Sequence, residues 1–282
     1  KKKSKLKEIL PILFEEFEDT RYKIVCLNEY EFISKYAHKN LSLNKNTDYD
    51  ILISIGGDGT ILSAIRSEYK HLKPIIGIHA GQLGFLAEGD LKNCRKIFKS
   101  IKEKNYNIES RSLLKVDVIN DNKKQSFICV NDLVVGRGAS ARIIKTEIYD
   151  NSILINRYEG DGLIISTANG STAYSLSSGG PIIFPNLNLI IITPICSHSL
   201  STRSIVLDGD SKLNIKFPDS PNRVKTLTLD GQVNIKLNKK SILNVTIAKE
   251  KIKFLLSKEL NYYSKLRSKM GWYNSIDNEK NN

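Results

Sequence analysis

Residues 56–60 of the sequence, Gly-Gly-Asp-Gly-Thr, place one carboxylate among three glycines. Glycine has no Cβ, so backbone N–H groups in such a turn can approach an anion closely. The turn follows an apolar run and precedes a helical pattern, and the start of a helix offers unpaired N–H groups and a positive dipole end. We therefore expect this turn to hold phosphate groups at the exit of a strand. It fits neither the P-loop spacing nor the GxGxxG fingerprint.

The carboxylate of this turn is its unusual element. Asp58 is electrostatically unfavourable in an anion-binding turn unless it has a task. Two tasks fit: holding Mg²⁺ against the phosphates, or accepting a proton from an attacking hydroxyl. The alternative is a plain turn in which the aspartate makes local hydrogen bonds. The strand-turn-helix context favours the functional interpretation.

The second half carries further polar groups in apolar surroundings. Asn131 and Asp132 interrupt a strand pattern, where polar groups must be paired or must face a ligand; a β-bulge explains them equally well. Residues 160–162, Gly-Asp-Gly, are typical of a turn. Residues 167–181 are dense in hydroxyls and glycine, which suit ribose and phosphate contacts, and Tyr174 could stack on a base. A Ser/Thr-rich loop that ends in a helix cap is the alternative for that segment.

The elements that position these residues differ between the two halves. Helical periodicity covers residues 6–18, 29–38, 61–69 and 91–104. Apolar runs typical of strands lie between them at 22–27, 50–55 and 75–78. Such alternation predicts a parallel sheet with helices on both sides.

After about residue 110 short strand patterns follow one another. They cover residues 113–119, 126–135, 141–149, 153–157, 163–166, 204–207, 213–217, 225–229, 233–237, 242–248 and 251–256. Turn pairs fall at 121–122 and 150–151, and Asp230-Gly231 is a strong hairpin signal. This half predicts an antiparallel β domain. Residues 262–272 are helical by pattern, and we expect this tail to pack on the first domain.

The expected fold class is therefore α/β plus all-β. An N-terminal domain with an open parallel α/β sheet covers residues 1–108 and carries the GGDGT turn. An antiparallel, β-sandwich-like domain covers residues 109–256 and carries the polar clusters, and residues 257–282 return to the first domain.

Composition limits the partners. The 282 residues carry a net charge of +13, but the lysines are spread along the chain with many Asn and Ile, so we expect no nucleic-acid partner. No apolar run is long enough for a transmembrane helix, and no signal peptide is visible. The four cysteines form no CxxC pair, which predicts reduced, buried thiols in a cytoplasmic protein.

From about Tyr49 to Trp272 the chain resembles the NAD kinases. The motifs that carry the resemblance are GGDGT at 56–60, GIHAGQLGFL at 77–86, Asn131-Asp132, GDG at 160–162, the segment 170–181 and the segment 194–207 with His198-Ser199-Leu200. The GGDGT turn alone also occurs in lipid kinases and phosphofructokinases, so the order of the second-half segments makes the match specific. The resemblance implies two domains, a homotetramer or homodimer, NAD and ATP as substrates, and Mg²⁺ held mainly through donor phosphates.

The resemblance also implies roles for individual residues. Asp58 acts on the adenosine 2′-hydroxyl, as general base or through metal, and Gly57, Gly59 and Thr60 contact phosphates. The NAD-binding residues that it implies are Asp58, Gly59, Phe85, Asn131, Asp132, Asp161, Thr172, Ala173, Tyr174 and Ser177. Among these, Asn131 and Asp132 hold ribose hydroxyls, Phe85 lines the NAD site, and Asp161 sits near the nicotinamide end, across a subunit interface.

The chain departs from the family in three places. Asp132 stands where the family usually has Glu, and Ala168-Asn169 stands where it usually has Pro-Thr. The shorter Asp and the loosened loop before Tyr174 are expected to shift nucleotide affinity without abolishing activity. The family's first strand is expected to be missing from the N-terminus.

Two other functions use the same turn. A lipid kinase would need an apolar tunnel or a membrane-binding patch, and the polar segment 172–177 argues against it. A non-catalytic nucleotide-binding regulator would not need Asp58. The preferred phosphoryl donor and the use of NADH stay open at this point.

Overall fold

Contacts divide the chain into two compact units. The first consists of Lys1–Ala64, Leu72–Glu109 and Lys253–Asn282, and the second of Ile65–His71 and Ser110–Ile252. The domain boundaries expected after residues 108 and 256 stay a prediction. The computed structural model describes residues 2–19, 22, 24–26, 41–43, 48–81, 84–138, 143–218, 225–238, 240–258 and 262–272. The helix expected at 29–38 lies outside these ranges.

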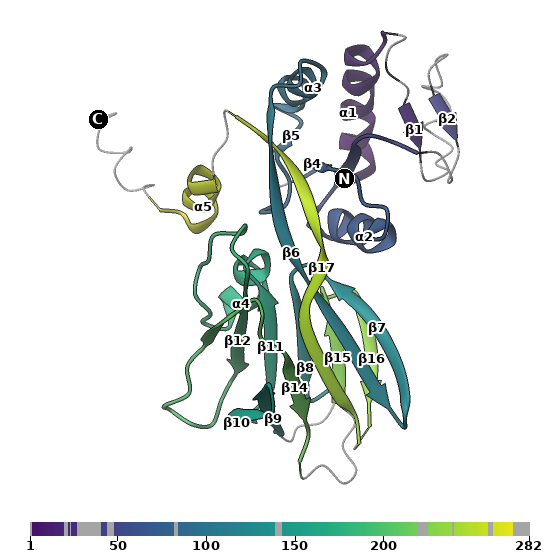
Figure 1. The fold of residues 1–282 in the computed structure, drawn as a ribbon. Helices are drawn as coiled ribbons and strands as arrows, with labels where there is room; N and C mark the ends of the chain where they lie inside the picture. Colours follow the sequence, from purple (N-terminus) through teal and green to yellow (C-terminus); the bar gives the residue numbers. More distant parts are fainter. Residues whose placement is uncertain are drawn as a thin grey trace, which may run out of the picture. The chain divides into compact units, whose positions relative to one another are not determined.

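The first unit contains the expected parallel sheet (Figure 1). Strand β3 (Leu52–Gly56) runs parallel to β4 (Ile75–His79), in a register that ends with Gly56 beside His79. The short strand β5 (Gly89–Asp90) and the end of β17 (Ile242–Ser257) also pair with β4 in parallel. The carboxyl ends of β3 and β4 therefore share one edge, where ligands bind in open parallel sheets. Strands β1 (Ile24–Cys26) and β2 (Leu41–Leu43) form a separate parallel pair.

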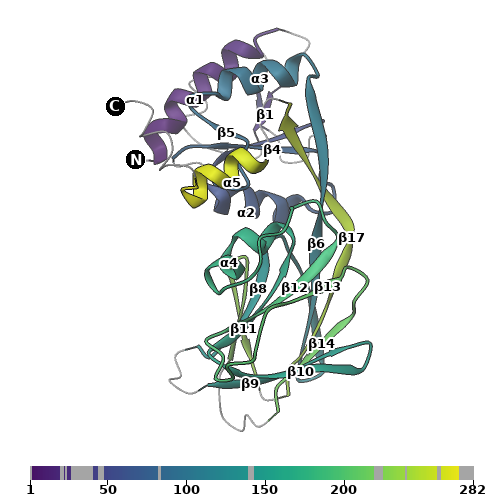
Figure 2. The same cartoon turned by 90° about the vertical axis from the view of Figure 1, so that its left-hand side faces the viewer.

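Two helices of the first unit bury apolar side chains in a shared core. Helix α1 (Lys2–Glu16) lies beside α3 (Cys94–Lys102), as Figure 2 shows. The residues of α3 at helical spacing, 94, 97, 98 and 101, are all buried, as the periodicity of 91–104 predicts. They pack with Ile9 and Leu13 of α1 and with Leu255 of β17 in one core.

Within the first unit, a buried ion pair holds helix α5 (Tyr262–Met270) to the segment before α3. Lys265 Nζ lies 2.6 Å from Glu88 Oε2, and the side chains are 8% and 3% exposed. Glu88 Oε1 accepts a second hydrogen bond from the backbone N–H of Ser257, at 2.7 Å. A buried carboxylate with both oxygens occupied holds two separate stretches of the chain together.

The second unit is an antiparallel β-sandwich. One sheet has the strand order β13 (Ile205–Asp208), β12 (Leu189–Ile195), β11 (Gly162–Thr167), β8 (Asp132–Gly136), β15 (Lys225–Leu229), β16 (Val233–Leu237). The facing strands are β10 (Ile153–Gly160), β9 (Ile144–Asp150), β14 (Leu213–Lys216), β17, β6 (Tyr106–Asn120) and β7 (Lys123–Cys129). Side chains of both layers, among them Ile148, Leu213, Leu163 and Leu227, form one core. Alternating burial along β9 and β15 matches this arrangement.

Three details of the second unit differ from the strand pattern of the sequence. The run 126–135 is two strands, β7 and β8, separated at Val130-Asn131. The patterns at 242–248 and 251–256 belong to one long strand, β17. Strand β12 was not expected; its residues 190–193 are buried and it pairs with β11 and β13.

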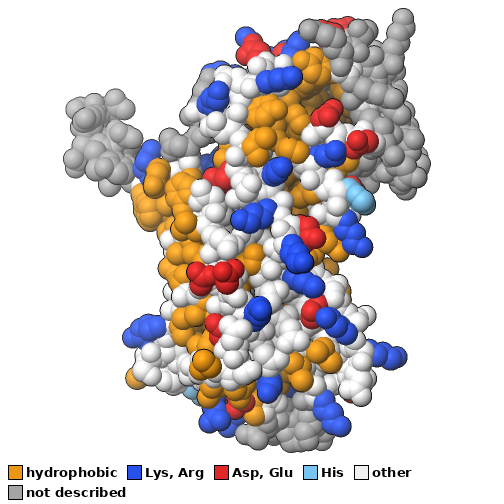
Figure 3. Space-filling model, in the orientation of Figure 1, with side chains coloured by type: hydrophobic (Ala, Val, Ile, Leu, Met, Phe, Trp, Pro, Cys, Tyr) orange, Lys and Arg blue, Asp and Glu red, His pale blue; other side chains and the backbone are white. Residues whose placement is uncertain are grey.

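The surface and the thiols carry less information. On the face in Figure 3, basic side chains are scattered among acidic and uncharged ones. No described helix is long and apolar enough to cross a membrane. The described cysteines are free thiols; Cys94 and Cys129 are buried, but Cys196 is exposed, which corrects the expectation that the thiols are buried. Cys196 follows β12 in a turn with φ of 46°, away from the core.

Candidate active site

The glycine-rich turn joins β3 directly to α2 (Asp58–Glu68). The helix begins at Asp58, earlier than the apolar pattern at 61–69 predicts, so the second half of GGDGT is the first helical turn. The N–H of Thr60 is bonded to the Gly57 carbonyl at 2.8 Å. Position 56 favours glycine over residues with a side chain, because a Cβ there would lie 2.4 Å from Thr60 Oγ1. The residues expected to contact phosphates therefore stand at the N-terminus of a helix at the carboxyl edge of the sheet.

The Asp58 carboxylate is held by the segment that follows β4. Its Oδ2 accepts hydrogen bonds from the backbone N–H groups of Phe85, at 3.0 Å, and Leu86, at 3.5 Å. Its Oδ1 is buried, and no described residue donates a hydrogen bond to it. Gly84 makes this approach possible, because a Cβ on it would lie 2.0 Å from Oδ1. An unpaired buried carboxylate oxygen is costly, so its retention fits a group that acts on a proton or a cation.

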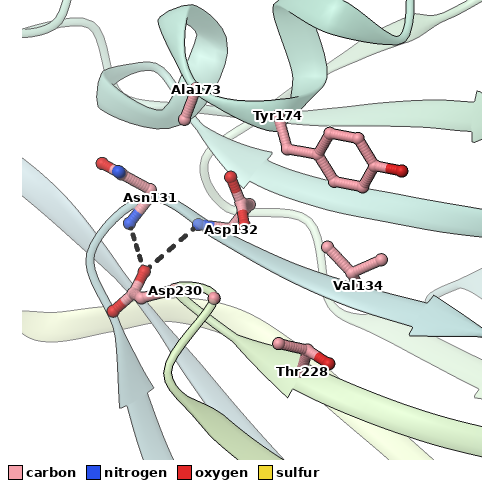
Figure 4. A pocket seen from close by; sticks show the side chains of 8 residues that line it. Asn131, Asp132, Val134, Ala173, Tyr174, Thr228 and Asp230 are labelled. Atoms are coloured by element: carbon pink, nitrogen blue, oxygen red, sulfur yellow. Dashed lines mark hydrogen bonds between the residues drawn. The ribbon is translucent and has the colours of Figure 1, made fainter. Parts of the chain in front are cut away.

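A pocket of about 380 Å³ opens in the second unit (Figure 4). Its lining residues are Asn131, Asp132, Val134, Ala173, Tyr174, Thr228, Asp230 and Gly231. The lining comes from the β7–β8 junction, from the start of α4 (Tyr174–Ser177) and from the β15–β16 hairpin. Tyr174 is 46% exposed, so its ring is accessible for stacking.

Asp230 organises the floor of this pocket, and sequence reasoning missed that role. Its Oδ1 accepts hydrogen bonds from the backbone N–H groups of Asn131, at 2.8 Å, and Val130, at 3.1 Å. Its Oδ2 accepts from Arg66 Nη1 at 2.9 Å, and its side chain is fully buried. The residue therefore ties the β7–β8 junction to the hairpin that it begins. Its sequence signal was only that of a turn, which is also correct, since Asp230 and Gly231 both have positive φ.

Asp132 is buried beside the Asp230 carboxylate. Burial, and then the neighbouring charge of Asp230, raise the pKa of Asp132 to about 7, although a hydrogen bond with the Tyr174 backbone opposes the shift. Asp132 therefore changes its charge near neutral pH. A carboxylate that loses its proton there can accept a hydrogen bond from a ligand hydroxyl.

The structure brings some predicted site residues together and leaves others elsewhere. Asn131, Asp132, Ala173 and Tyr174 share the pocket. Thr172 and Ser177 belong to adjoining turns but do not line it. Asp161 is also not in the lining; its Oδ1 lies 3.4 Å from Arg137 Nε. Asp58, Phe85 and the phosphate-turn residues Gly57, Gly59 and Thr60 belong to the first unit.

Family models match both halves of the chain. The N-terminal domain of the ATP-NAD kinases matches residues 7–106, and the C-terminal domain matches residues 130–257. The chain belongs to the NAD kinase family.

Individual relatives agree with this membership. An NAD kinase from Clostridium botulinum (strain 657 / Type Ba4) is 38% identical over 273 residues, covering 95% of this chain and 91% of that protein. An NAD kinase from Sulfurimonas denitrificans is 39% identical over 223 residues, covering 79% of this chain and 78% of that protein.

Solved structures of the NAD kinase family share the fold. A crystal structure of yeast NADH kinase complexed with NADH has a TM-score of 0.86 at 25% identity, covering 96% of this chain and 84% of that one. An NAD kinase from Archaeoglobus fulgidus in complex with ATP has a TM-score of 0.69 at 21% identity, covering 88% and 97%. The expected fold class, a parallel α/β part with an antiparallel β-sandwich, is thereby confirmed.

Proposed function

We propose that this chain transfers a phosphoryl group from ATP to the 2′-hydroxyl of the adenosine ribose of NAD, giving NADP. Membership of the NAD kinase family supports the reaction. The observation that carries the site assignment is that Asn131, Asp132, Ala173 and Tyr174, from separate segments, line one pocket. An aromatic ring beside a carboxylate and a carboxamide matches a nucleoside, which offers a base to stack and hydroxyls to bind.

Asp58 is proposed to accept the proton of the 2′-hydroxyl. Its Oδ2 is fixed by Phe85 and Leu86, which leaves Oδ1, to which no residue of the described ranges donates, for the acceptor. Gly57, Gly59 and Thr60 are proposed to bind phosphates with the helix N-terminus behind them. Phosphoryl transfer needs positioning and charge neutralisation more than covalent chemistry. A carboxylate and a glycine-rich, phosphate-binding turn are therefore the types of group that the reaction requires.

A divalent metal, most simply Mg²⁺, fits the same turn. No group of three or more His, Cys, Asp or Glu that could hold a metal exists among the described residues. Asp58, with its unpaired Oδ1, is the protein group offered to a cation. Mg²⁺ is commonly held by one or two carboxylates and the phosphates of the substrate, and when bound it neutralises phosphate charge.

The NAD-binding residues are proposed to divide the dinucleotide between them. Tyr174 and Ala173 take the adenine, and Asn131 and Asp132 take ribose hydroxyls, because their chemistry suits those groups. Thr172 and Ser177, on turns beside this pocket, contribute further hydroxyls. Phe85 lines the NAD site, and Asp161 is proposed to serve the nicotinamide end.

The finer biological setting is also proposed. We expect a homotetramer or homodimer in the cytoplasm, without a membrane or nucleic-acid partner. The free thiols of the described cysteines and the scattered basic side chains of Figure 3 support this setting.

The test is an assay of NADP formation from NAD, with ATP, another nucleoside triphosphate or polyphosphate as donor. NADH and a diacylglycerol are offered in parallel as acceptors. NADP formation that depends on a divalent metal is the expected result. Tight NADP binding without turnover would identify a regulator instead, and labelling of the lipid a lipid kinase.

A further inference from the structure

A buried chain of side chains leads from the second unit's interior to the proposed NAD pocket. Arg111 is 5% exposed, and its Nη1 donates a hydrogen bond to Asn169 Oδ1 at 2.6 Å. Asn169 Nδ2 in turn donates to Asn131 Oδ1, also at 2.6 Å. Asn131 lines the pocket (Figure 4), whereas Arg111 and Asn169 do not.

The donor-only guanidinium fixes the direction of this chain. A carboxamide can usually be turned over, because its oxygen and nitrogen ends have similar shapes. Arginine has no acceptor, so the end of Asn169 that meets Arg111 must be the oxygen. The amino end of Asn169 must then face Asn131, and it can be satisfied only by the Asn131 oxygen. The orientation of the Asn131 carboxamide therefore follows from Arg111.

The backbone around Asn169 is built for this contact. Thr167 N–H bonds to the Asn131 carbonyl at 2.9 Å, and Thr167 Oγ1 bonds to the Val130 carbonyl at 2.8 Å. A Cβ on Gly170 would lie 2.1 Å from the Asn131 carbonyl oxygen, so glycine lets the turn after β11 approach the β7–β8 junction. Asn169 is thereby held against Asn131 on both sides.

The amino group of Asn131 is left for a ligand. No described residue accepts a hydrogen bond from Asn131 Nδ2, and the neighbouring Asp132 offers a carboxylate. A donor beside an acceptor matches a hydroxyl, which accepts from one and donates to the other.

We propose that Asn169 is a positioning residue, which holds the Asn131 carboxamide with its amino group toward the 3′-hydroxyl of the adenosine ribose of NAD, the hydroxyl that is not phosphorylated. The inference rests on the proposed function for the identity of the ligand. It also gives a physical role to a residue that departs from the Pro-Thr usual in the family.

The decisive variant is Asn169→Asp. The carboxylate keeps the bond to Arg111 but cannot donate to Asn131, so the Asn131 carboxamide turns over and presents its oxygen to the ribose hydroxyl. We expect KM for NAD to rise by about 10- to 100-fold, as for a hydrogen bond replaced by an unpaired polar contact. The kcat, the KM for ATP and the melting temperature stay close to those of the wild type.

Two further variants separate orientation from packing. Asn169→Ala removes the chain without imposing the wrong orientation, so its KM for NAD should lie between those of the wild type and Asn169→Asp. Asn214→Asp is the matched control, because Asn214 Nδ2 donates to Asn244 Oδ1 at 2.7 Å in an amide pair outside the pocket. The control should behave as the wild type.

An NAD analogue whose adenosine lacks the 3′-hydroxyl tests whether Asn169→Asp weakens binding through that hydroxyl. In calorimetry without ATP, the wild type should bind the analogue clearly more weakly than NAD, whereas Asn169→Asp should bind the two almost equally. The inference is overturned if Asn169→Asp binds NAD within about 2-fold of the wild type, or if Asn169→Ala binds NAD more weakly than Asn169→Asp does. It is also overturned if the loss of affinity from the variant and the loss from the analogue are independent and therefore multiply. Should Asn169→Asp not fold, the same analogue on Asn169→Ala decides. Absent NADP formation by the wild type would overturn the proposed function alone, because these affinities need no turnover.

Discussion

Among the described residues, Asp58 has hydrogen-bond donors for Oδ2 and none for its buried Oδ1. The bonds from Phe85 and Leu86 fix the side chain in place. A side chain in this state contributes little to stability and is free to act on a substrate proton.

Asp58→Asn therefore separates catalysis from folding. The amide keeps the shape of the side chain but cannot take the proton, so kcat should fall by about 10²- to 10⁴-fold. The melting temperature and NAD affinity should change little. Steady-state kinetics and calorimetry on the same preparation check this, and near-normal turnover of the variant would refute the assigned role.

Asp132 predicts a pH dependence of stability. Its pKa is about 7 in the folded protein and near 4 when unfolded, so between these values the folded state binds more protons. Stability should therefore fall as pH rises from about 4 to about 7, by on the order of 4 kcal/mol from this group.

Asp132→Asn removes this dependence. Urea unfolding at several pH values should show a flatter profile than the wild type and greater stability at pH 7 and above. Asp210→Asn, at an exposed position, is the control and should follow the wild type. A variant profile that still falls between pH 4 and 7 would contradict the role of Asp132.

At the scale of elements, the segment after β4 must lie against the first turn of α2. Gly84→Ala places a methyl group where the Asp58 carboxylate now lies. We expect kcat to fall by at least about 10-fold, since displacements near 1 Å can cost about 100-fold. Gly136→Ala is the control, because a Cβ there meets nothing within 4 Å. Indistinguishable kinetics of Gly84→Ala and Gly136→Ala would contradict the close approach of Gly84 to the Asp58 carboxylate.

The ion pair between α2 and the β15–β16 hairpin predicts a large loss of stability when broken. Arg66→Met leaves the Asp230 carboxylate buried without a cation, with only backbone N–H groups and the Cys129 thiol as donors, at a cost of about 3–5 kcal/mol. Arg95→Met breaks an Arg-carboxylate pair with Glu15 in which both side chains are more than half exposed, and should cost less than about 1 kcal/mol. Denaturant unfolding compares the two, and equal losses would refute the argument.

Helices and strands could be predicted from the sequence where a single spacing of apolar residues, or the residues of a turn, dominate the segment. The helix at 94–102 and the hairpin at Asp230-Gly231 follow from local spacing and turn chemistry. Strand β12 was missed because Pro194 within its apolar run argues against a strand. In the structure Pro194 lies beyond Ile192, the last residue of β12 that pairs with β13. The role of Asp230 and the contact between Arg111 and Asn169 depend on residues far apart in sequence, which no local pattern encodes.

At the scale of the whole molecule, the first unit is assembled from three separate stretches. Its last stretch, Lys253–Asn282, supplies Leu255 to the core and Lys265 to the Glu88 ion pair. Lys265→Met leaves Glu88 buried without its cation, so we expect a loss of about 3–5 kcal/mol. Thermal unfolding checks this, with Lys99→Met at an exposed i,i+4 pair as control; equal melting temperatures would contradict it.

This discontinuity has a consequence for biosynthesis. A ribosome that has delivered residues 110–252 has released nearly all of the β-sandwich, which can close while translation continues. The first unit, although its first stretch is made before the β-sandwich, must wait for Leu255 and Lys265 to emerge before its core and its buried ion pair can form. A nascent chain therefore carries its glycine turn on an unfinished unit until the stretch that begins at Lys253 has been made.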